Sequence, residues 1–241
     1  MTSVSQAPPD VAILCGGRGE RLRSVLGDLP KPLAPIQGRP FLEWLVRDLA
    51  AQGFRRAILC TGYGREQIRA HFARLALPIE IVFSEEEAPL GTGGALAQAA
   101  RIARTESLLG LNGDSFTALD LVAMVREHER HPERPLLAVV PANARQDAGS
   151  VRVENGWVKA FGEKRKLAGA GFHSAGIYLI PVALLRAVSP GQNVSIEQEL
   201  LPEWALTGLR AWVHEGELTD IGTPERLERA RTAQAIPGGW H

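Results

Sequence analysis

The sequence is poor in the features that mark several classes of protein. It holds only two cysteines, Cys15 and Cys60, in 241 residues, which excludes a disulfide framework. Each ends an apolar run that is typical of a buried strand, so we expect both thiols to be small core side chains. No apolar run approaches the roughly 18 residues of a membrane-spanning helix, and the N-terminus lacks the basic and apolar segments of a signal peptide.

The chain also lacks a net charge, because 27 Lys and Arg residues balance 27 Asp and Glu residues. No long-range field therefore attracts a polyanion, so we expect neither nucleic acid nor a membrane as a partner. The length allows one substantial core. We expect a flexible tail over residues 1–10 and a single domain over residues 11–241, and the sequence leaves open whether copies form a homo-oligomer.

Apolar runs alternate with helical patterns through the first two thirds of the chain. Runs typical of strands cover 11–15, 56–62, 79–84, 107–113 and 135–142, and amphipathic helical patterns cover 41–53, 65–76, 93–103 and 119–130. This alternation predicts an α/β fold of three αβα layers, in which a Rossmann-like, mostly parallel sheet carries helices on both faces. Ligands of such sheets gather at the carboxyl ends of the strands.

After Pro141 the pattern changes to two alternating runs around Asn155-Gly156, which is a hairpin signal. A further strand is expected over about 173–180, and an amphipathic helix over 224–235 closes the chain, with Pro224 in its first turn. We expect the hairpin to belong to a small β region that returns to the main sheet.

A glycine-rich loop, GGRGERL, directly follows the first strand. Gly16, Gly17 and Gly19 allow backbone conformations closed to residues with a Cβ, so several N–H groups can converge on an anion. Two cations, Arg21 and Lys31, follow at fixed places beyond the loop. Together these features predict a site for a nucleotide's phosphates, which favours a cytoplasmic protein.

Two better-known glycine patterns are excluded. A P-loop requires GxxxxGK followed by Ser or Thr, whereas here the lysine stands twelve residues after Gly19, inside Pro30-Lys31-Pro32. The dinucleotide pattern GxGxxG would begin at Gly17, but Leu22 stands in place of its third glycine. The loop therefore matches neither a Walker site nor a Rossmann cofactor site.

Nine motifs together resemble the sugar-phosphate nucleotidylyltransferase family and follow that family's order. They are GGRGERL, PKPLAPIQGRPFLEW, GYGREQI, EEAPLGTGGAL, LNGDSF, FGEK, HSAGIYLI, SIEQELLP and TDIGTPE. Within the family the chain looks most like the D-glycero-D-manno-heptose 1-phosphate guanylyltransferases. One departure is Glu20, which stands where the family usually has Thr or Ser; we expect it to point away from the nucleotide or to meet a nearby arginine.

The resemblance implies an enzyme that joins a nucleoside triphosphate to a sugar 1-phosphate with the help of magnesium, Mg²⁺. Asp114 follows a strand and Asp220 precedes a turn, so both carboxylates can reach one ion, and they match the family's metal ligands. The resemblance makes Arg21, Lys31 and Asp114 the catalytic residues. It assigns nucleotide contacts to Leu14, Cys15, Gly16, Gly17, Gly19, Glu86, Gly91, Thr92 and Gly93, and contacts with the sugar phosphate to Asn112, Gly149, Glu163 and Lys164.

The base and the sugar are less sharply indicated. Glu85, Glu86 or Glu87 can accept hydrogen bonds from the two adjacent donors of guanine, which favours GTP. We expect GTP and a heptose 1-phosphate to give a nucleotide sugar and pyrophosphate, for cell-surface polysaccharide. The alternatives are a mannose 1-phosphate guanylyltransferase, an N-acetylmuramate 1-phosphate uridylyltransferase, or a regulatory relative that binds a nucleotide sugar without turnover.

Overall fold

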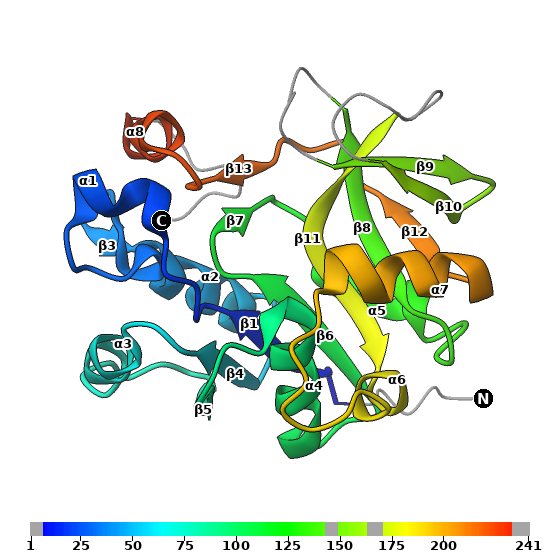
Figure 1. The fold of residues 1–241 in the computed structure, drawn as a ribbon, viewed down its shortest axis with the longest axis horizontal. Coiled ribbons are helices and arrows are strands. Elements are labelled where there is room, and N and C mark those ends of the chain that lie inside the picture. Colours follow the sequence, from blue (N-terminus) through cyan, green and yellow to red (C-terminus); the bar gives the residue numbers. More distant parts are fainter. Residues whose placement is uncertain (1–6, 143–148, 163–170, 233–241) are drawn as a thin grey trace.

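A nine-stranded sheet forms the centre of the computed structural model, which describes residues 7–142, 149–162 and 171–232 (Figure 1). Its strands lie in the order β5-β4-β1-β6-β11-β8-β12-β10-β9. They are β1 (Asp10–Leu14), β4 (Arg56–Thr61), β5 (Glu80–Glu85), β6 (Ser107–Asn112), β8 (Leu136–Pro141), β9 (Ser150–Glu154), β10 (Trp157–Gly162), β11 (Phe172–Pro181) and β12 (Arg210–Val213). Within those ranges no helix is long and apolar enough to cross a membrane.

Helices cover both faces of the sheet, and shorter elements surround its edges. The α-helices are α1 (Arg23–Leu26), α2 (Phe41–Ala51), α3 (Arg65–Phe72), α4 (Gly91–Ile102), α5 (Leu121–His128), α6 (Val182–Arg186), α7 (Leu201–Thr207) and α8 (Pro224–Thr232). The short elements are η1 (Glu20–Leu22), η2 (Lys31–Leu33), η3 (Ile196–Leu200), β2 (Pro35–Ile36), β3 (Arg39–Pro40), β7 (Ser115–Phe116) and β13 (Thr219–Asp220). The last three residues predicted for the closing helix lie outside the described residues.

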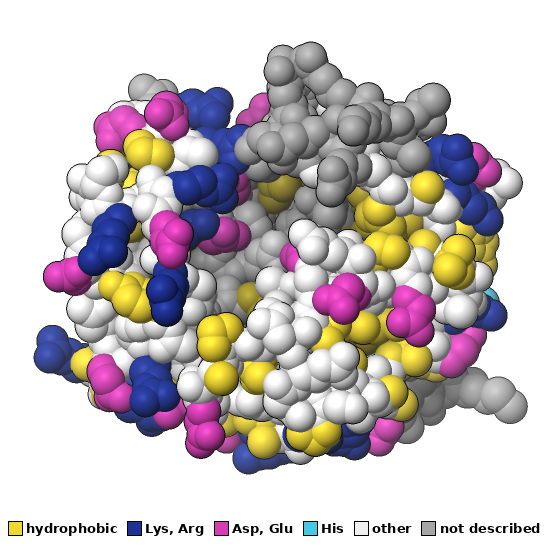
Figure 2. All heavy atoms as spheres, viewed as in Figure 1, with side chains coloured by type: hydrophobic (Ala, Val, Ile, Leu, Met, Phe, Trp, Pro, Cys, Tyr) yellow, Lys and Arg dark blue, Asp and Glu magenta, His cyan; other side chains and the backbone are white. Residues whose placement is uncertain are grey.

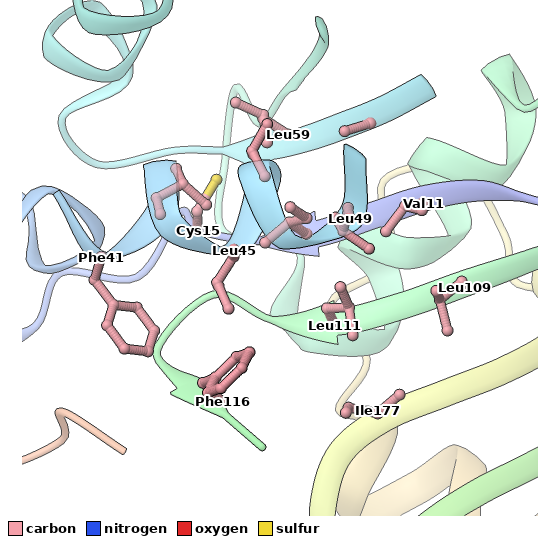
Figure 3. Packing of buried hydrophobic residues seen from close by; sticks show 14 of the residues in the cluster. Val11, Cys15, Phe41, Leu45, Leu49, Leu59, Leu109, Leu111, Phe116 and Ile177 are labelled. Atoms are coloured by element: carbon pink, nitrogen blue, oxygen red, sulfur yellow. The ribbon is translucent and has the colours of Figure 1, made fainter. Parts of the chain in front are cut away.

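The half of the sheet formed by the N-terminal strands is parallel, since β5, β4, β1 and β6 pair in parallel. Val11 of β1 belongs to an apolar cluster with Leu45 and Leu49 of α2, which lie over the strands in Figure 3. The next residue, Ala12, belongs to a second cluster on the other face, with Leu96 of α4. Burial on both faces explains why these strands read as continuous apolar runs. The predicted arrangement of βαβ units is confirmed.

The other half of the sheet is mixed. β11 runs antiparallel between β6 and β8, and β12 runs parallel to β8. β9 and β10 form the predicted hairpin, whose turn residues Asn155 and Gly156 have φ values of 52° and 77°. Positive φ at both central residues is what a tight hairpin turn of this kind requires. The β region therefore continues the main sheet, as expected.

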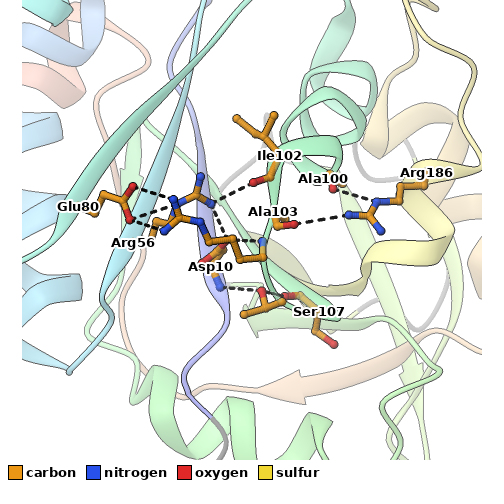
Figure 4. A network of polar contacts seen from close by, with 10 residues as sticks. Asp10, Arg56, Glu80, Ala100, Ile102, Ala103, Ser107 and Arg186 are labelled. Carbon is orange, nitrogen blue, oxygen red and sulfur yellow. Dashed lines mark hydrogen bonds and ion pairs between the residues drawn. The ribbon is translucent and has the colours of Figure 1, made fainter.

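Asp10 begins β1, although the sequence placed it at the end of a loose tail. Its carboxylate is buried and accepts hydrogen bonds from Nη1 of Arg56 at 2.6 Å and from the backbone N–H of Arg104 at 2.8 Å. Nη1 of Arg56 also donates to the carbonyl of Ile102 at 3.2 Å, so one buried ion pair joins the starts of β1 and β4 to the end of α4 (Figure 4). This pairing holds Asp10 in the strand.

We expect Asp10→Ala to lower the free energy of unfolding by about 3 to 5 kcal/mol, because it leaves the buried guanidinium of Arg56 without its main partner. Urea unfolding at pH 7, followed by circular dichroism, measures the loss. Glu129→Ala, at an exposed acidic position just after α5, serves as the control. A loss below about 1 kcal/mol for Asp10→Ala, the usual value of an exposed pair, would contradict this role.

Candidate active site

A cleft of about 1370 Å³ opens at the carboxyl ends of the central strands. In Figure 2 the surface is hollowed between the part of the chain that carries α1 and the part that carries α7. The segments that follow β1, β4, β5 and β6 supply most of the lining, through residues 14–21, 62–67, 86–89, 91, 92 and 112–114. Four strand ends therefore converge on one cleft, at the edge of the sheet where ligands were expected to gather.

The glycine-rich loop forms one wall of this cleft. At Gly16 a Cβ would lie 2.8 Å from the backbone nitrogen of Gly62 and 3.0 Å from Oε1 of Glu86, so only glycine fits there. Gly19 has a φ of 61°, and Gly17 faces open space. The loop thus turns tightly against the neighbouring strand ends and presents its backbone to the cleft.

Leu14 and Cys15 border the loop and also line the cleft. Cys15 is 2% exposed, and its Sγ donates to the carbonyl of Cys60 at 3.2 Å. Burial raises the pKa of the Cys15 thiol well above its usual value, so this sulfur remains protonated and is no nucleophile. Both cysteines are free and buried, as the sequence predicts.

Glu20 lies in η1 at the mouth of the cleft with an exposed side chain. Among the residues that the structure describes, it makes neither an ion pair nor a hydrogen bond with an arginine. The contact with an arginine that the sequence suggested for it is therefore absent from the described part of the chain.

Lys31 and Asp114 meet across the cleft. The ammonium group of Lys31 forms an ion pair with Oδ2 of Asp114, and the two side chains are 12% and 41% exposed. The stem of Lys31 lies along the glycine loop, since a Cβ on Gly19 would stand 2.9 Å from the Lys31 Cβ and 3.6 Å from its Cδ. The cation therefore stands between the loop and the carboxylate.

Asp220 lies close to Asp114, next to the lining of the cleft. Asp220, in β13, pairs with Ser115 of β7, and the N–H of Ile221 donates to the carbonyl of Asp114 at 3.0 Å. Asp114, which comes directly before β7, is therefore close to Asp220 along the backbone pairing. Oδ1 of Asp220 accepts from the N–H of Gly222 at 2.9 Å and from Nη1 of Arg226 at 3.1 Å. Asp220 itself is not part of the lining, whereas Gly222 is.

Arg21 reaches the same corner. A Cβ added to Gly222 would lie 2.9 Å from Oδ1 of Asp220 and 3.5 Å from Nη2 of Arg21. Arg21 and Asp114 therefore line the cleft, and Asp220 lies beside its lining residue Gly222. Within the described ranges no group of three or more His, Cys, Asp or Glu side chains could hold a metal ion. The donor set suits Mg²⁺, which takes one or two protein carboxylates and completes its shell with phosphate oxygens and water.

Helix α4 opens at the cleft, but its first residues have different surroundings. Gly91 has a φ of 68° and lines the cleft together with Thr92, whose Oγ1 donates to Oε2 of Glu197 at 2.7 Å. Gly93 does not line the cleft, and its N–H donates to the carbonyl of Val194 at 2.8 Å. This arrangement favours a packing role for Gly93 over the contact with a nucleotide that the sequence suggested.

The three consecutive glutamates also separate. Glu85 turns away to pair with Arg69. Glu86 lines the cleft, and its Oε2 accepts from the N–H of Leu90 at 3.0 Å while Oε1 lies against Gly16. Burial raises the pKa of Glu86. Glu87 is exposed at the rim. Glu86 is thus the acidic side chain that is fixed in the wall.

The residues expected to bind the sugar phosphate are only partly brought together. Asn112 ends β6 and lines the cleft, and its amide fits against β11 because Gly176 there has no side chain: a Cβ would lie 2.6 Å from Nδ2 of Asn112. Gly149 is exposed outside the lining, and its carbonyl accepts from Nδ1 of His173 at 3.0 Å. Glu163 and Lys164 lie outside the described residues.

Glu197 is an acidic residue of the cleft that was not singled out from the sequence. Glu197 in η3 lines the cleft, accepts from Thr92, and accepts from the hydroxyl of buried Tyr178 at 3.4 Å. Burial and the Glu197 carboxylate raise the pKa of Tyr178, so its hydroxyl remains a donor. The sequence held a signal, because Glu197 lies inside SIEQELLP, but the motif did not show which of its glutamates faces the site.

The comparisons with known proteins agree with this geometry. A model of the nucleotidyl transferase family matches residues 11–235. The chain belongs to this family. Among the relatives of this nucleotidyl transferase, a D-glycero-alpha-D-manno-heptose 1-phosphate guanylyltransferase from Aneurinibacillus thermoaerophilus is 35% identical over 228 residues, covering 92% of this chain and 96% of the relative. A mannose-1-phosphate guanylyltransferase from Mycobacterium tuberculosis is 32% identical over 91% of this chain and 63% of the relative.

Solved structures confirm the fold. HddC from Yersinia pseudotuberculosis matches the nucleotidyl transferase with a TM-score of 0.81 and 30% identity, covering 93% of this chain and 98% of HddC. A second crystal structure shows HddC complexed with GMP-PN. A putative glucose-1-phosphate thymidylyltransferase from Bacillus anthracis, at 19% identity and a TM-score of 0.77, shares the fold. The predicted enzyme class, a nucleotidylyltransferase, is confirmed by the family.

Proposed function

We propose that this nucleotidyl transferase joins GTP to D-glycero-α-D-manno-heptose 1-phosphate, giving a GDP-linked heptose and pyrophosphate for cell-surface polysaccharide. The observation that carries the proposal is the meeting of the glycine loop, Lys31, Arg21 and Asp114 in one cleft, with Glu86 fixed in its wall and Asp220 beside its lining residue Gly222. The heptose guanylyltransferase that covers nearly the same length supports the substrate pair. We place the reaction in the cytoplasm, where GTP is found.

The reaction joins two anions. An oxygen of the sugar phosphate bonds to the α-phosphorus of GTP, while the bond from that phosphorus to the bridging oxygen breaks and pyrophosphate carries away the electron pair. Both substrates repel each other, so the protein must neutralise charge and fix the geometry in line. The loop's backbone binds the triphosphate, while Arg21 and Lys31 neutralise its phosphates as charge develops.

Asp114 and Asp220 would hold Mg²⁺ at the end of the cleft where Arg21 lies. When bound, the ion neutralises phosphate oxygens and makes the phosphorus more electrophilic. Asn112 borders the adjoining part of the cleft, where the sugar phosphate would enter. Its position in the lining supports a contact between the Asn112 side chain and the sugar phosphate.

Glu86 supports guanine as the base. Oε2 is fixed by the N–H of Leu90, so the carboxylate is held in one orientation at the wall of the cleft. Guanine presents N1–H and an amino group side by side, and a carboxylate is the side chain that accepts from both. Uracil and thymine present a single ring N–H beside carbonyl oxygens, which a carboxylate repels.

We expect Glu86→Gln to lower kcat/KM for GTP by about tenfold to a hundredfold, because hydrogen bonds to a charged acceptor contribute about 1.5 to 3 kcal/mol. The amide oxygen can still accept from Leu90, so the fold should be kept. Pyrophosphate release with GTP and with UTP measures the change in the ratio of the two. Glu87→Gln, at the rim, is the matched control, and an unchanged GTP preference in Glu86→Gln would exclude this residue as the reader of the base.

A pyrophosphate-release assay tests the function as a whole. It combines GTP, UTP, dTTP, CTP and ATP in turn with heptose 1-phosphate, mannose 1-phosphate and N-acetylmuramate 1-phosphate. We expect the strongest signal with GTP and the heptose 1-phosphate, and none after EDTA. A signal confined to mannose 1-phosphate, or to UTP, would replace the proposed substrates, and binding of a nucleotide sugar without any turnover would identify a regulatory protein.

A further inference from the structure

Each carboxylate expected to bind metal is already paired with a cation of the protein. Asp114 forms its ion pair with Lys31, and Asp220 forms one with Nη1 of Arg226 at 3.1 Å. The Lys31 side chain is only 12% exposed, so water screens its pair with Asp114 less than it would screen a surface pair. A divalent ion approaching Asp114 must therefore compete with an ammonium group for the same carboxylate.

The position of Lys31 allows its charge to move between two partners without a change in the backbone. The residue stands between Pro30 and Pro32, which restrict its main chain. Its stem runs along Gly19 of the phosphate loop and ends at Asp114. Rotation of the flexible four-carbon stem can therefore take the ammonium group from the aspartate to a phosphate lying on the loop.

We propose that Lys31 and a divalent metal ion exclude each other at Asp114, so that the ion binds tightly only once a triphosphate on the loop has drawn the lysine away. The inference rests on the proposed function, since it needs a nucleotide at this loop. Lys31 then has two tasks: it neutralises phosphate in the loaded enzyme, and it blocks the metal site in the free enzyme. When the Lys31 ammonium group leaves Asp114 and the metal ion arrives, one cation replaces another, so the carboxylate is not left with an uncompensated charge.

A lysine that served only as a phosphate contact would have no effect on metal binding to the free enzyme, and this difference is measurable. The experiment titrates Mn²⁺ into the full chain without nucleotide and follows the electron paramagnetic resonance signal of the free ion. Lys31→Met removes the charge and keeps the length of the stem. We expect it to bind Mn²⁺ at least about tenfold more tightly than the wild type does, because a neighbouring positive charge is lost.

Three further variants define the cause of the gain. Lys31→Arg keeps the charge and should keep the weak affinity of the wild type. Lys31→Met combined with Asp114→Asn should lose the gain, because the carboxylate that the ion would occupy is gone. Lys159→Met, at an exposed lysine of β10, is the matched control and should bind as the wild type does.

An Mn²⁺ affinity that is the same in the wild type and in Lys31→Met would overturn the inference. Lys31→Gln, which also lacks the charge, replaces the methionine variant if thermal melting shows that the latter does not fold. The titration uses neither GTP nor a sugar phosphate, so it is independent of the proposed substrates. A tenfold gain in Mn²⁺ affinity alongside no turnover of GTP would support the inference and refute the proposed function. Turnover of GTP with an unchanged Mn²⁺ affinity would support the proposed function and refute the inference.

Discussion

Arg21→Ala will lower kcat by about 10²- to 10³-fold, the loss that follows when one charge-stabilising donor is removed from an active site. Arg21 lies in η1, directly after the glycine-rich loop. Its Nη2 lies beside Gly222, which is also next to Oδ1 of Asp220. Its forked guanidinium can bond two phosphate oxygens at once. We expect KM for GTP to change less than kcat, because the negative charge on the leaving pyrophosphate grows toward the transition state.

Arg23→Ala is the matched control for this prediction. Arg23 begins α1 two residues later, is also exposed, and does not line the cleft. Steady-state kinetics of both variants, measured by pyrophosphate release, should therefore separate a local role from a general loss of positive charge. If folded Arg21→Ala turned over GTP within about threefold of the wild type, the guanidinium would have no part in stabilising charge.

The elements of the parallel half of the sheet could be predicted because their signals are local. An apolar run of five to seven residues followed by an amphipathic stretch predicts one βαβ unit after another, and the turn at Asn155-Gly156 is encoded in two neighbouring residues. The cleft follows from the same reasoning, since carboxyl ends of parallel strands share one edge of a sheet. Neither step requires knowledge of distant contacts.

The features that escaped prediction depend on contacts between distant parts of the chain. Gly93 and Gly91 look alike in sequence, and both pack against Val194 about a hundred residues further on, yet only Gly91 lines the cleft. The same segment brings Glu197 to Thr92. The insertion of β11 between β6 and β8 likewise fixes Asn112 against Gly176, and no local pattern indicates which strands become neighbours.

Asp114→Asn will lower kcat by about 10³-fold, and EDTA will abolish turnover in the wild type, if the two aspartates hold the metal. The substitution keeps the size of the side chain but removes the negative charge, and Asn is a much weaker ligand for Mg²⁺. It also removes the partner of the Lys31 ammonium group. Asp48→Asn is the control, since Asp48 lies on α2 outside the cleft and can keep its bond from Gln52.

The metal dependence separates this role from a purely structural one. If Asp114 is a ligand, raising the concentration of Mn²⁺ should recover part of the activity of Asp114→Asn, because the remaining oxygen ligands still favour the ion. If Asp114 served only to hold Lys31, Asp114→Asn would lose activity because the lysine lost its orientation. Added Mn²⁺ would then recover none of that activity. Turnover of Asp114→Asn that is close to that of the wild type, at the same Mg²⁺ concentration, would remove this aspartate from the metal site and leave Asp220 without its predicted partner.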